Sequence, residues 1–230
     1  MRLSKKSSYM IRFFDIFFSL TSLIVLSPFF LIICLVLKFT GEGEVFYSQK
    51  RVGLGLSLIN IYKFATMKKN SEFIGTGTLT VKNDPRILPL GIFLRDTKLN
   101  ELPQLLNILK GDMSIIGPRP QTEESFSMFP ENSIEILKSL KPGLSGIGSI
   151  IFSKEEEILE DKEDPIFFYK NYIAPYKASL EKWFLKNRNL LSYFMLIFLT
   201  IFVVITKRNN LPYYFYDLPE IPDKLKDYLN

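Results

Sequence analysis

The segment that decides the fold is Lys98–Pro120, which reads KLNELPQLLNILKGDMSIIGPRP. Four leucines between Leu102 and Leu109 recur at helical spacing, which predicts a short helix. Gly111 follows at a position where a glycine commonly ends a helix. Asn100 is then expected as the N-cap of this helix, and Glu101 as a carboxylate in its first turn.

The same segment has the composition of a site that handles anions. It carries two carboxylates, Glu101 and Asp112, and it places Arg119 between two prolines that stiffen the backbone. An arginine held in this way is suited to two-pronged contact with a phosphate group. The alternative for Arg119 is a structural ion pair with Asp112 or Glu123.

The composition of the whole chain narrows the chemistry. Of the 230 residues, 47% are hydrophobic and 21 are phenylalanine, which is rich for a soluble protein and indicates contact with lipid. A net charge of +5 suits an anionic partner, either nucleic acid or an anionic membrane surface. The sequence has no histidine and one cysteine, Cys34, which excludes a disulfide framework or a cysteine-based zinc site within one chain. Chemistry near neutral pH must therefore rest on carboxylates, lysine, arginine, tyrosine or a metal bound through oxygen.

Near the N-terminus, the run Phe13–Phe39 is long and apolar enough to cross a membrane. Ser27 and Pro28 lie near its middle, where a proline kinks or breaks a helix. Asp15 suits a helix that is not fully exposed to lipid. Basic residues flank both ends, so the positive charges do not assign the ends to opposite sides. The residues alone leave two interpretations open: a kinked transmembrane helix, or a helix-break-helix hairpin that enters and leaves on the cytoplasmic side.

The rest of the chain predicts an α-rich α+β fold. Short alternating patterns at Val45–Ser48 and Leu56–Phe64 predict a small β-hairpin with Gln49–Arg51 at its turn. A helical pattern then runs through Leu90 to Arg95. The acidic run Lys154–Asp164 is expected to be a solvated helix face.

Two later segments are expected to contact the membrane. Asp164–Arg188 alternates aromatic and basic residues, which is typical of an interfacial helix whose aromatic side chains face lipid. The same alternation occurs in nucleic-acid-binding proteins, but the neighbouring apolar segments favour lipid. Leu190–Ile205 is a second apolar run, short for a membrane span and expected to be membrane-embedded.

Eight short pieces follow one another in order between Lys50 and Gly146. They are KRVG (50–53), YKFATM (62–67), NDPRI (83–87), FLR (93–95), NELPQL (100–105), NILKGDMS (107–114), GPRP (117–120) and KPGLSG (141–146). This succession resembles the bacterial sugar transferases, the monotopic phosphoglycosyl transferases, over about Tyr9–Gly146. Several ordered motifs make the resemblance specific where a single one would not.

The resemblance implies a function. Enzymes of this family transfer a phosphosugar from a UDP-sugar to a polyprenyl phosphate, usually undecaprenyl phosphate, with Mg²⁺ and release of UMP. They begin lipid-linked polysaccharide assembly at the cytoplasmic face of the bacterial inner membrane. The resemblance also implies a re-entrant helix broken at Ser27 and Pro28, which favours the hairpin interpretation. The expected partners are these substrates and inner-membrane lipid, without nucleic acid, and a homo-oligomer is left open.

On this basis the chain is divided into four parts. They are a re-entrant membrane helix (1–40), a cytosolic or interfacial catalytic domain (41–188), a second membrane-embedded helix (189–206) and a C-terminal tail (207–230).

The resemblance fails at the position that matters most. It implies an Asp-Glu pair whose aspartate attacks the donor phosphate, but this chain has Asn100 beside Glu101, and an amide is a poor nucleophile. Three interpretations follow. Glu101 or a nearby carboxylate, Asp96 or Asp112, attacks instead; or the polyprenyl phosphate attacks the donor directly while Asn100 helps to hold Mg²⁺ or phosphate; or the chain is an inactive membrane scaffold that binds UDP-sugar or pathway partners.

The chemistry of the residues and the family resemblance together give the candidate site residues. Asn100, Glu101 and Asp112 are the expected catalytic residues, and Glu101 and Asp112 the expected Mg²⁺ ligands. One basic family position is occupied by Ala65 instead. The expected phosphate-binding residues are Lys50, Arg51, Lys63, Arg95 and Arg119.

The segment after KPGLSG also departs from the family. A Gln-Val-x-Gly-Arg pattern is usual there, and this chain has Ile147–Phe152 instead. The departure indicates a different donor pocket and points to an N-acetylated or deoxyamino hexose.

Overall fold

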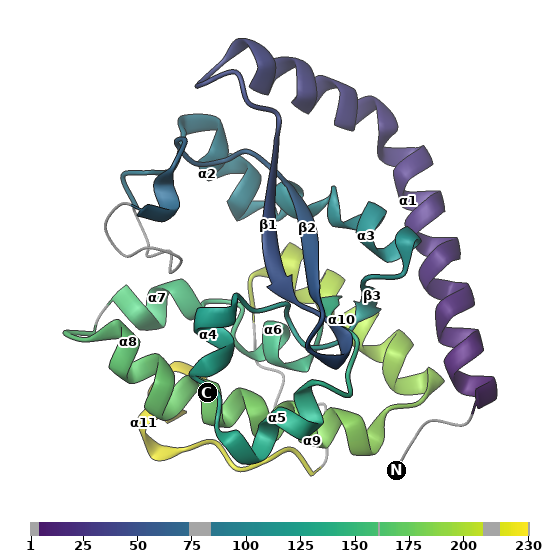
Figure 1. Cartoon of the computed structure of the whole chain (residues 1–230), viewed down its shortest axis with the longest axis vertical. Coiled ribbons are helices and arrows are strands. Elements are labelled where there is room, and N and C mark those ends of the chain that lie inside the picture. Colours follow the sequence, from purple (N-terminus) through teal and green to yellow (C-terminus); the bar gives the residue numbers. More distant parts are fainter. Residues whose placement is uncertain (1–4, 74–83, 161, 209–216, 230) are drawn as a thin grey trace.

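The computed structural model describes residues 5–73, 84–160, 162–208 and 217–229. Over these residues the chain is rich in helix and has two small two-stranded sheets (Figure 1). Asn83 of the NDPRI piece and residues 209–216 of the predicted tail lie outside the described residues. The helices are α1 (Lys5–Phe39), α2 (Pro89–Asp96), α3 (Gln104–Lys110), α4 (Glu123–Ser127), α5 (Glu131–Leu137), α6 (Ile147–Ile151), α7 (Glu155–Glu160), α8 (Pro165–Phe168), α9 (Ala174–Asn187), α10 (Leu190–Thr206) and α11 (Asp223–Leu229). The strands are β1 (Phe46–Val52), β2 (Leu58–Phe64), β3 (Ser114–Ile116) and β4 (Gly143–Ser145), with short 3₁₀ turns at Leu54–Leu56, Ser71–Phe73 and Leu99–Glu101 and a π-helical turn at Tyr169–Ile173.

α1 is one helix that continues through Pro28 and curves over the molecule (Figure 1). Pro28 has no N–H to donate to the carbonyl of Ile24, four residues earlier. The Ser27 hydroxyl donates to that carbonyl instead, at 2.8 Å. The Ser-Pro pair therefore bends the helix without separating it into the two helices that the sequence suggested. A re-entrant path through a membrane stays a prediction.

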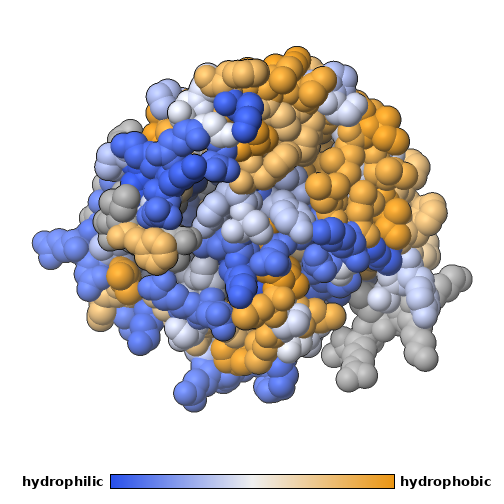
Figure 2. Space-filling model, turned by 45° about the horizontal axis from the view of Figure 1, so that its top comes forward, coloured by the Kyte–Doolittle hydropathy of each residue, from blue (hydrophilic) through white to orange (hydrophobic). Residues whose placement is uncertain are grey.

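α1 presents a hydrophobic surface to the outside. In Figure 2 hydrophobic side chains gather along the right and the top, where α1 lies in Figure 1. Among the described residues α1 is the helix long and apolar enough to cross a membrane, and α10 is apolar but shorter. Its exposed apolar side chains include Phe13, Phe17, Leu20, Ile24, Val25, Phe29, Leu31 and Ile32.

A buried acid fixes α1 to the rest of the fold. Asp15 is 2% exposed. Its carboxylate accepts hydrogen bonds from the Ser114 hydroxyl at 2.9 and 3.0 Å and from the Ile115 backbone N–H at 2.9 Å. It also accepts one from the Tyr193 hydroxyl at 2.9 Å. The acid that the sequence marked as unsuited to lipid thus joins α1 to β3 and α10.

The β-hairpin is confirmed, but the predicted turn was wrong. β1 pairs with β2 in antiparallel register from Phe46 opposite Phe64 to Val52 opposite Leu58. The residues 49–51 therefore lie within β1. The chain turns instead after β1, around Gly53 and Gly55. Gly55 adopts a positive φ of 66°, a conformation that a side chain disfavours.

β2 places the hairpin between two small clusters of buried side chains. Ile61 packs with residues of α3, among them Ile108, whereas Phe64 packs with Leu37 of α1 and Leu94 of α2. The hairpin is therefore held by α1 and α2, which precede the segment quoted at the start, and by α3, which lies within that segment.

The segment 164–188 is helical as predicted, but it belongs to the core. Tyr169, Tyr176 and Phe184 are buried in the main hydrophobic cluster instead of facing lipid. The same aromatic pattern is compatible with a helix at a lipid surface and with a helix in a protein core. Packing of α9 against α5 and α6 places it in the core. The acidic run forms α7 with Glu156, Glu157 and Glu160 exposed, as predicted for a solvated helix face, while Ile158 and Leu159 are buried.

We expect Asp15→Ala to destabilise the protein by about 3 kcal/mol, because three buried donors lose their acceptor. The measurement is the midpoint of denaturant unfolding in detergent, followed by the fluorescence of Trp183. Thr21→Ala, on the exposed side of α1, is the matched control and should stay within about 0.5 kcal/mol of the native chain. Equal midpoints for the two variants would contradict the role of Asp15.

Candidate active site

The Asn-Glu pair lies in a 3₁₀ turn between α2 and α3. Lys98 begins this turn with a positive φ of 60°, and α3 begins only after Pro103, without a side-chain cap. The prediction that Asn100 caps α3 was therefore wrong. Both side chains instead turn inward, with Asn100 5% and Glu101 9% exposed.

The loop that carries Arg119 is held by backbone contacts between the GPRP piece (117–120) and the KPGLSG piece (141–146). β3 and β4 pair in parallel, and directly after β3 the Gly117 N–H donates to the carbonyl of Ser145 in β4 at 2.8 Å. Gly143 N–H donates to the carbonyl of Pro118 at 2.8 Å. A Cβ on Gly117 would lie 2.3 Å from the carbonyl oxygen of Lys141, so only glycine permits this approach. The prolines and this pairing together fix the backbone of Arg119.

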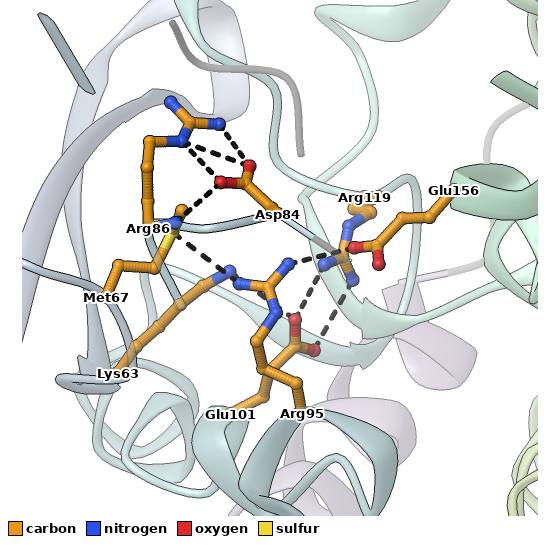
Figure 3. A network of polar contacts seen from close by, with 8 residues as sticks. All are labelled: Lys63, Met67, Asp84, Arg86, Arg95, Glu101, Arg119 and Glu156. Carbon is orange, nitrogen blue, oxygen red and sulfur yellow. Dashed lines mark hydrogen bonds and ion pairs between the residues drawn. The ribbon is translucent and has the colours of Figure 1, made fainter. Parts of the chain in front are cut away.

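Glu101 accepts hydrogen bonds from two cations (Figure 3). Arg119 Nη2 donates to Glu101 Oε1 at 2.6 Å, and Nη1 lies 3.4 Å from Oε2. Lys63 Nζ, from β2, lies 3.4 Å from Oε1. Arg119 therefore forms an ion pair, but with neither of the partners considered from the sequence.

This contact sets the protonation of the network. Burial raises the pKa of Glu101, but the charges of Arg119 and Lys63 lower it more, so the net pKa lies well below its usual range. Burial lowers the pKa of Lys63 to about 8, and Glu101 opposes that shift. At neutral pH the cluster therefore contains an ionised carboxylate and a lysine close to its titration point.

A cavity of about 1070 Å³ lies against this network. Its lining includes four of the five predicted phosphate-binding cations, Arg51, Lys63, Arg95 and Arg119, together with Asn100 and Glu101. Another part of the lining is apolar and comes from α10, with Ile197, Ile201 and Val204. The cavity thus combines cationic groups with a hydrophobic wall.

Three buried polar atoms in this lining lack a hydrogen-bond partner among the described residues. They are the amide oxygen Oδ1 of Asn100, the guanidinium Nε of Arg51 and the hydroxyl oxygen of Ser149. Buried polar atoms are nearly always paired in native proteins, so unpaired ones in a cavity indicate a ligand or ordered water. Burial lowers the pKa of Arg51 to about 10 and the charge of Arg119 adds to this shift, yet the guanidinium remains a cation at neutral pH.

Two further ion pairs lie near this network (Figure 3). Arg95 of α2 donates to Glu156 of α7 at 2.9 Å and contacts the sulfur of Met67 (Figure 3). Arg86 and Asp84 form a buried pair at 2.5 Å, which holds the pKa of Asp84 below its usual range. Sequence reasoning gave this pair no role, although both residues stand in the NDPRI piece.

The structure does not bring every predicted residue to the cavity. Asp112 follows α3 and accepts a hydrogen bond from Asn107 at 3.3 Å, and it is not part of the lining. Lys50 is exposed on β1 and is also outside the lining. Asp96 does line the cavity. The predicted phosphate-binding set thus assembles with the exception of Lys50.

The residues present fit a magnesium ion that shares its ligands with a substrate. The unpaired Oδ1 of Asn100 and the carboxylate of Glu101 are oxygen donors of the kind that Mg²⁺ takes. Mg²⁺ commonly uses one or two protein oxygens and fills its remaining positions with water and substrate phosphate. Among the described residues, no group of three or more acidic, histidine or cysteine side chains is placed so that it could hold a metal ion by itself. The fit therefore rests on Asn100 and Glu101 and not on Asp112.

The sequence was also compared with known protein families and proteins. The family model described as bacterial sugar transferase matches residues 6–207. The chain is 47% identical over 108 residues to the exopolysaccharide production protein PSS of Rhizobium leguminosarum, covering 47% of this chain and 54% of that protein.

Two further relatives align over more of the chain. It is 33% identical over 221 residues to the undecaprenyl-phosphate galactose phosphotransferase of Salmonella typhimurium, covering 89% of this chain and 42% of that protein. It is 34% identical over 176 residues to the UDP-glucose:undecaprenyl-phosphate glucose-1-phosphate transferase of Escherichia coli, covering 74% of this chain and 36% of that protein. The chain thus spans about half or less of the length of these relatives. Because the family model covers most of the sequence, the chain belongs to the bacterial sugar transferase family.

Proposed function

We propose that the chain transfers a phosphosugar from a UDP-sugar to a polyprenyl phosphate, with release of UMP. The observation that carries the proposal is one cavity that joins a cationic cluster to an apolar wall. Relatives named for transfer to undecaprenyl phosphate support this acceptor. Their names give both galactose and glucose as the sugar, so they do not choose the sugar for this chain.

The cationic part of the cavity suits the donor diphosphate. Within the local cluster, Arg119 and Lys63 share one carboxylate, Glu101, and the charge of Arg51 lies close to that of Arg119, which leaves net positive charge for an anion. Guanidinium groups bind phosphate through paired hydrogen bonds, and the unpaired Nε of Arg51 has a free donor there. We infer that the diphosphate binds between these three side chains.

The apolar part suits the lipid acceptor. Ile197, Ile201 and Val204 of α10 line the cavity, while other apolar side chains of α10, among them Phe198 and Ile205, are exposed on the outside. A prenyl chain that reaches the cavity along α10 would bury apolar surface on both. The exposed apolar side chains of α1 support attachment of the enzyme to the membrane from which this lipid comes.

We infer that an oxygen of the polyprenyl phosphate attacks the β-phosphorus of the donor directly. A bond forms from this oxygen to phosphorus, and the bond from phosphorus to the oxygen that bridges to the α-phosphate breaks, so UMP leaves with that electron pair. Arg119 and Lys63 stabilise the negative charge of the leaving group. When bound, Mg²⁺ held by Asn100 and Glu101 would neutralise diphosphate charge.

Attack by Glu101 is less favoured by this geometry. Its carboxylate is bound by Arg119 and Lys63, and the same charges lower its pKa, so its electron pairs are less available. An amide at position 100 cannot replace it as a nucleophile. Asn100 and Glu101 are therefore assigned to binding and positioning, and the acceptor phosphate supplies the attacking oxygen.

We expect the purified chain, supplied with UDP-sugars, undecaprenyl phosphate and Mg²⁺, to release UMP. Omission of the lipid phosphate should abolish UMP release, because direct transfer has no first half-reaction without an acceptor. Glu101→Gln should lower turnover by at least about 100-fold, since the two cations lose their anchor. Failure to release UMP with any donor would contradict the activity and favour an inactive scaffold.

The two chemical routes are separated by intact-mass spectrometry of the chain incubated with a donor. We expect no phosphosugar adduct on the native protein. Asn100→Asp restores the carboxylate that the family resemblance implies as the nucleophile, and it is the matched positive control. An adduct on the native chain, lost in Glu101→Gln, would instead assign the attack to the glutamate.

We expect the affinity for UDP to fall by up to about tenfold per pH unit above pH 8. The pKa of Lys63 is lowered to about 8 in the free protein, and bound diphosphate raises it by favouring the ammonium form. Binding above pH 8 therefore takes up a proton, and affinity falls until the pKa of the complex is reached. Calorimetric titration at several pH values measures this slope.

Lys63→Arg is the control for this experiment. A guanidinium stays charged over the same range, so the variant should bind UDP with little dependence on pH between 8 and 9.5. An unchanged slope in Lys63→Arg would assign the titration to another group.

A further inference from the structure

A second, small cavity adjoins the main one. It has a volume of about 40 Å³ and lies between the end of β1, α4, α5, α6 and α9. Arg119, Gln121, Ser149 and Lys177 line both cavities. A ligand bound at Arg119 in the main cavity therefore lies beside the entrance of this side cavity.

One edge of the side cavity is polar and incompletely bonded. Glu181 of α9 is 4% exposed, and its Oε2 has no hydrogen-bond partner among the described residues. Ser149 of α6 also lines the cavity, and its hydroxyl oxygen is buried and unpartnered in the same sense. Two unsatisfied oxygens on one small cavity indicate a group that hydrogen-bonds to both.

The two unpartnered groups of this edge, the carboxyl group of Glu181 and the hydroxyl group of Ser149, are uncharged near neutral pH. Burial raises the pKa of Glu181 to about 8, although the charge of Lys177 and a hydrogen bond from the Gly148 backbone N–H oppose this shift. Lys177 itself is paired with Glu155. The edge therefore offers a carboxylic acid and a hydroxyl, which suit a neutral polar group better than a phosphate.

The opposite wall is apolar. It is formed by Phe126 and Phe129 around α4 and by Leu137 and Leu140 at and after the end of α5. The occupant must therefore combine a hydrogen-bonding part with a small apolar part.

Size limits the occupant further. A cavity needs about 10–15 Å³ for each water molecule that it holds. A volume of about 40 Å³ therefore accepts roughly three heavy atoms. A hexose ring is too large, and a single hydroxyl leaves the apolar wall without contact. An acetamido group has an N–H, a carbonyl and a methyl group. The three heavy atoms of its acetyl part match this size, and its polar and apolar parts match the two walls.

We propose that the side cavity binds the acetamido substituent of a UDP-N-acetylhexosamine donor, with Ser149 and Glu181 as the residues that determine this specificity. The inference rests on the proposed function, because it takes the donor diphosphate to lie at Arg119. The amide bonds to the two oxygens, and the methyl group packs against the four apolar side chains. A donor with a hydroxyl in place of the acetamido group leaves the buried oxygens without these partners.

The experiment is calorimetric titration of the full chain in lipid nanodiscs with UDP, UDP-glucose and UDP-N-acetylglucosamine, and with the two corresponding galactose donors. We expect the N-acetylated donors to bind at least about tenfold more tightly than their hydroxyl counterparts. Ser149→Ala should reduce this ratio to about threefold or less and leave the affinity for UDP unchanged.

Two variants of Glu181 form a matched pair. Glu181→Gln keeps a hydrogen-bonding group of the same shape and should keep most of the preference. Glu181→Met has a side chain of similar length without a hydrogen-bonding group, and this variant should lose the preference for N-acetylated donors. Ser179→Ala removes a hydroxyl of α9 that bonds within its own helix to the Tyr176 carbonyl, and should change nothing.

The outcomes separate this proposal from the proposed function. Equal affinity for both classes of donor, with UDP still bound, would overturn the acetamido site and leave a cavity that holds water. A loss of affinity for UDP as large as that for the sugar donors in Ser149→Ala would also overturn it, since the residue would then act on the fold. Absence of UDP binding to the native chain would remove the proposed function itself.

Discussion

The carboxylate of Glu101 is the group on which the site depends, because its two cationic partners come from separate parts of the chain. Lys63 stands on β2, and Arg119 stands on a loop after β3. Without an anion between them these charges would repel each other and Arg51 in a partly buried space. With it, the cluster is stable and still has an excess of positive charge. The same contact that completes the fold thus leaves a place for a diphosphate, and it makes the carboxylate a weaker nucleophile.

α1 links the hydrophobic surface of the molecule to this cluster. Its outer side chains are apolar and exposed, while Asp15 on its inner face is bound by β3 and α10. Arg12, one turn earlier, donates to the carbonyls of Ile108 and Leu109 at 2.5 and 2.8 Å, at the end of α3. α3 follows directly on the turn that carries Glu101, and β3 leads into the loop that carries Arg119. A helix suited to lipid is therefore braced against both segments that form the site, which is the arrangement needed if an acceptor reaches the cavity from a membrane.

Local sequence patterns predicted where helices and strands form, but they did not predict as well which residues pack against them. The helix ended by Gly111, the helix at Arg95 and the antiparallel hairpin followed from spacing and from glycine positions, which act within a few residues. The hairpin turn was misplaced because the basic residues 49–51 were taken for a loop, although backbone pairing accepts them in a strand. Asn100 satisfied the composition rule for a helix cap, yet the positive φ of Lys98 and the 3₁₀ turn shift the start of α3 to Pro103. The aromatic residues of α9 could serve a lipid surface or a core, and their periodicity contained no information about which neighbours would cover them.

The sequence by itself determined the family, the apolar helices and most of the cationic set, since these depend on residue type, order and local spacing. Only the tertiary structure decided which of these residues meet. It brought Arg51, Lys63, Arg95 and Arg119 to one cavity with Asn100 and Glu101, and it left Asp112 and Lys50 outside. It also joined Ser149 and Glu181, which lie on different helices and carry no motif, at the edge of a second cavity. The physical reason is that burial and the pairing of charges depend on contacts between segments distant in sequence, and no local pattern specifies those contacts.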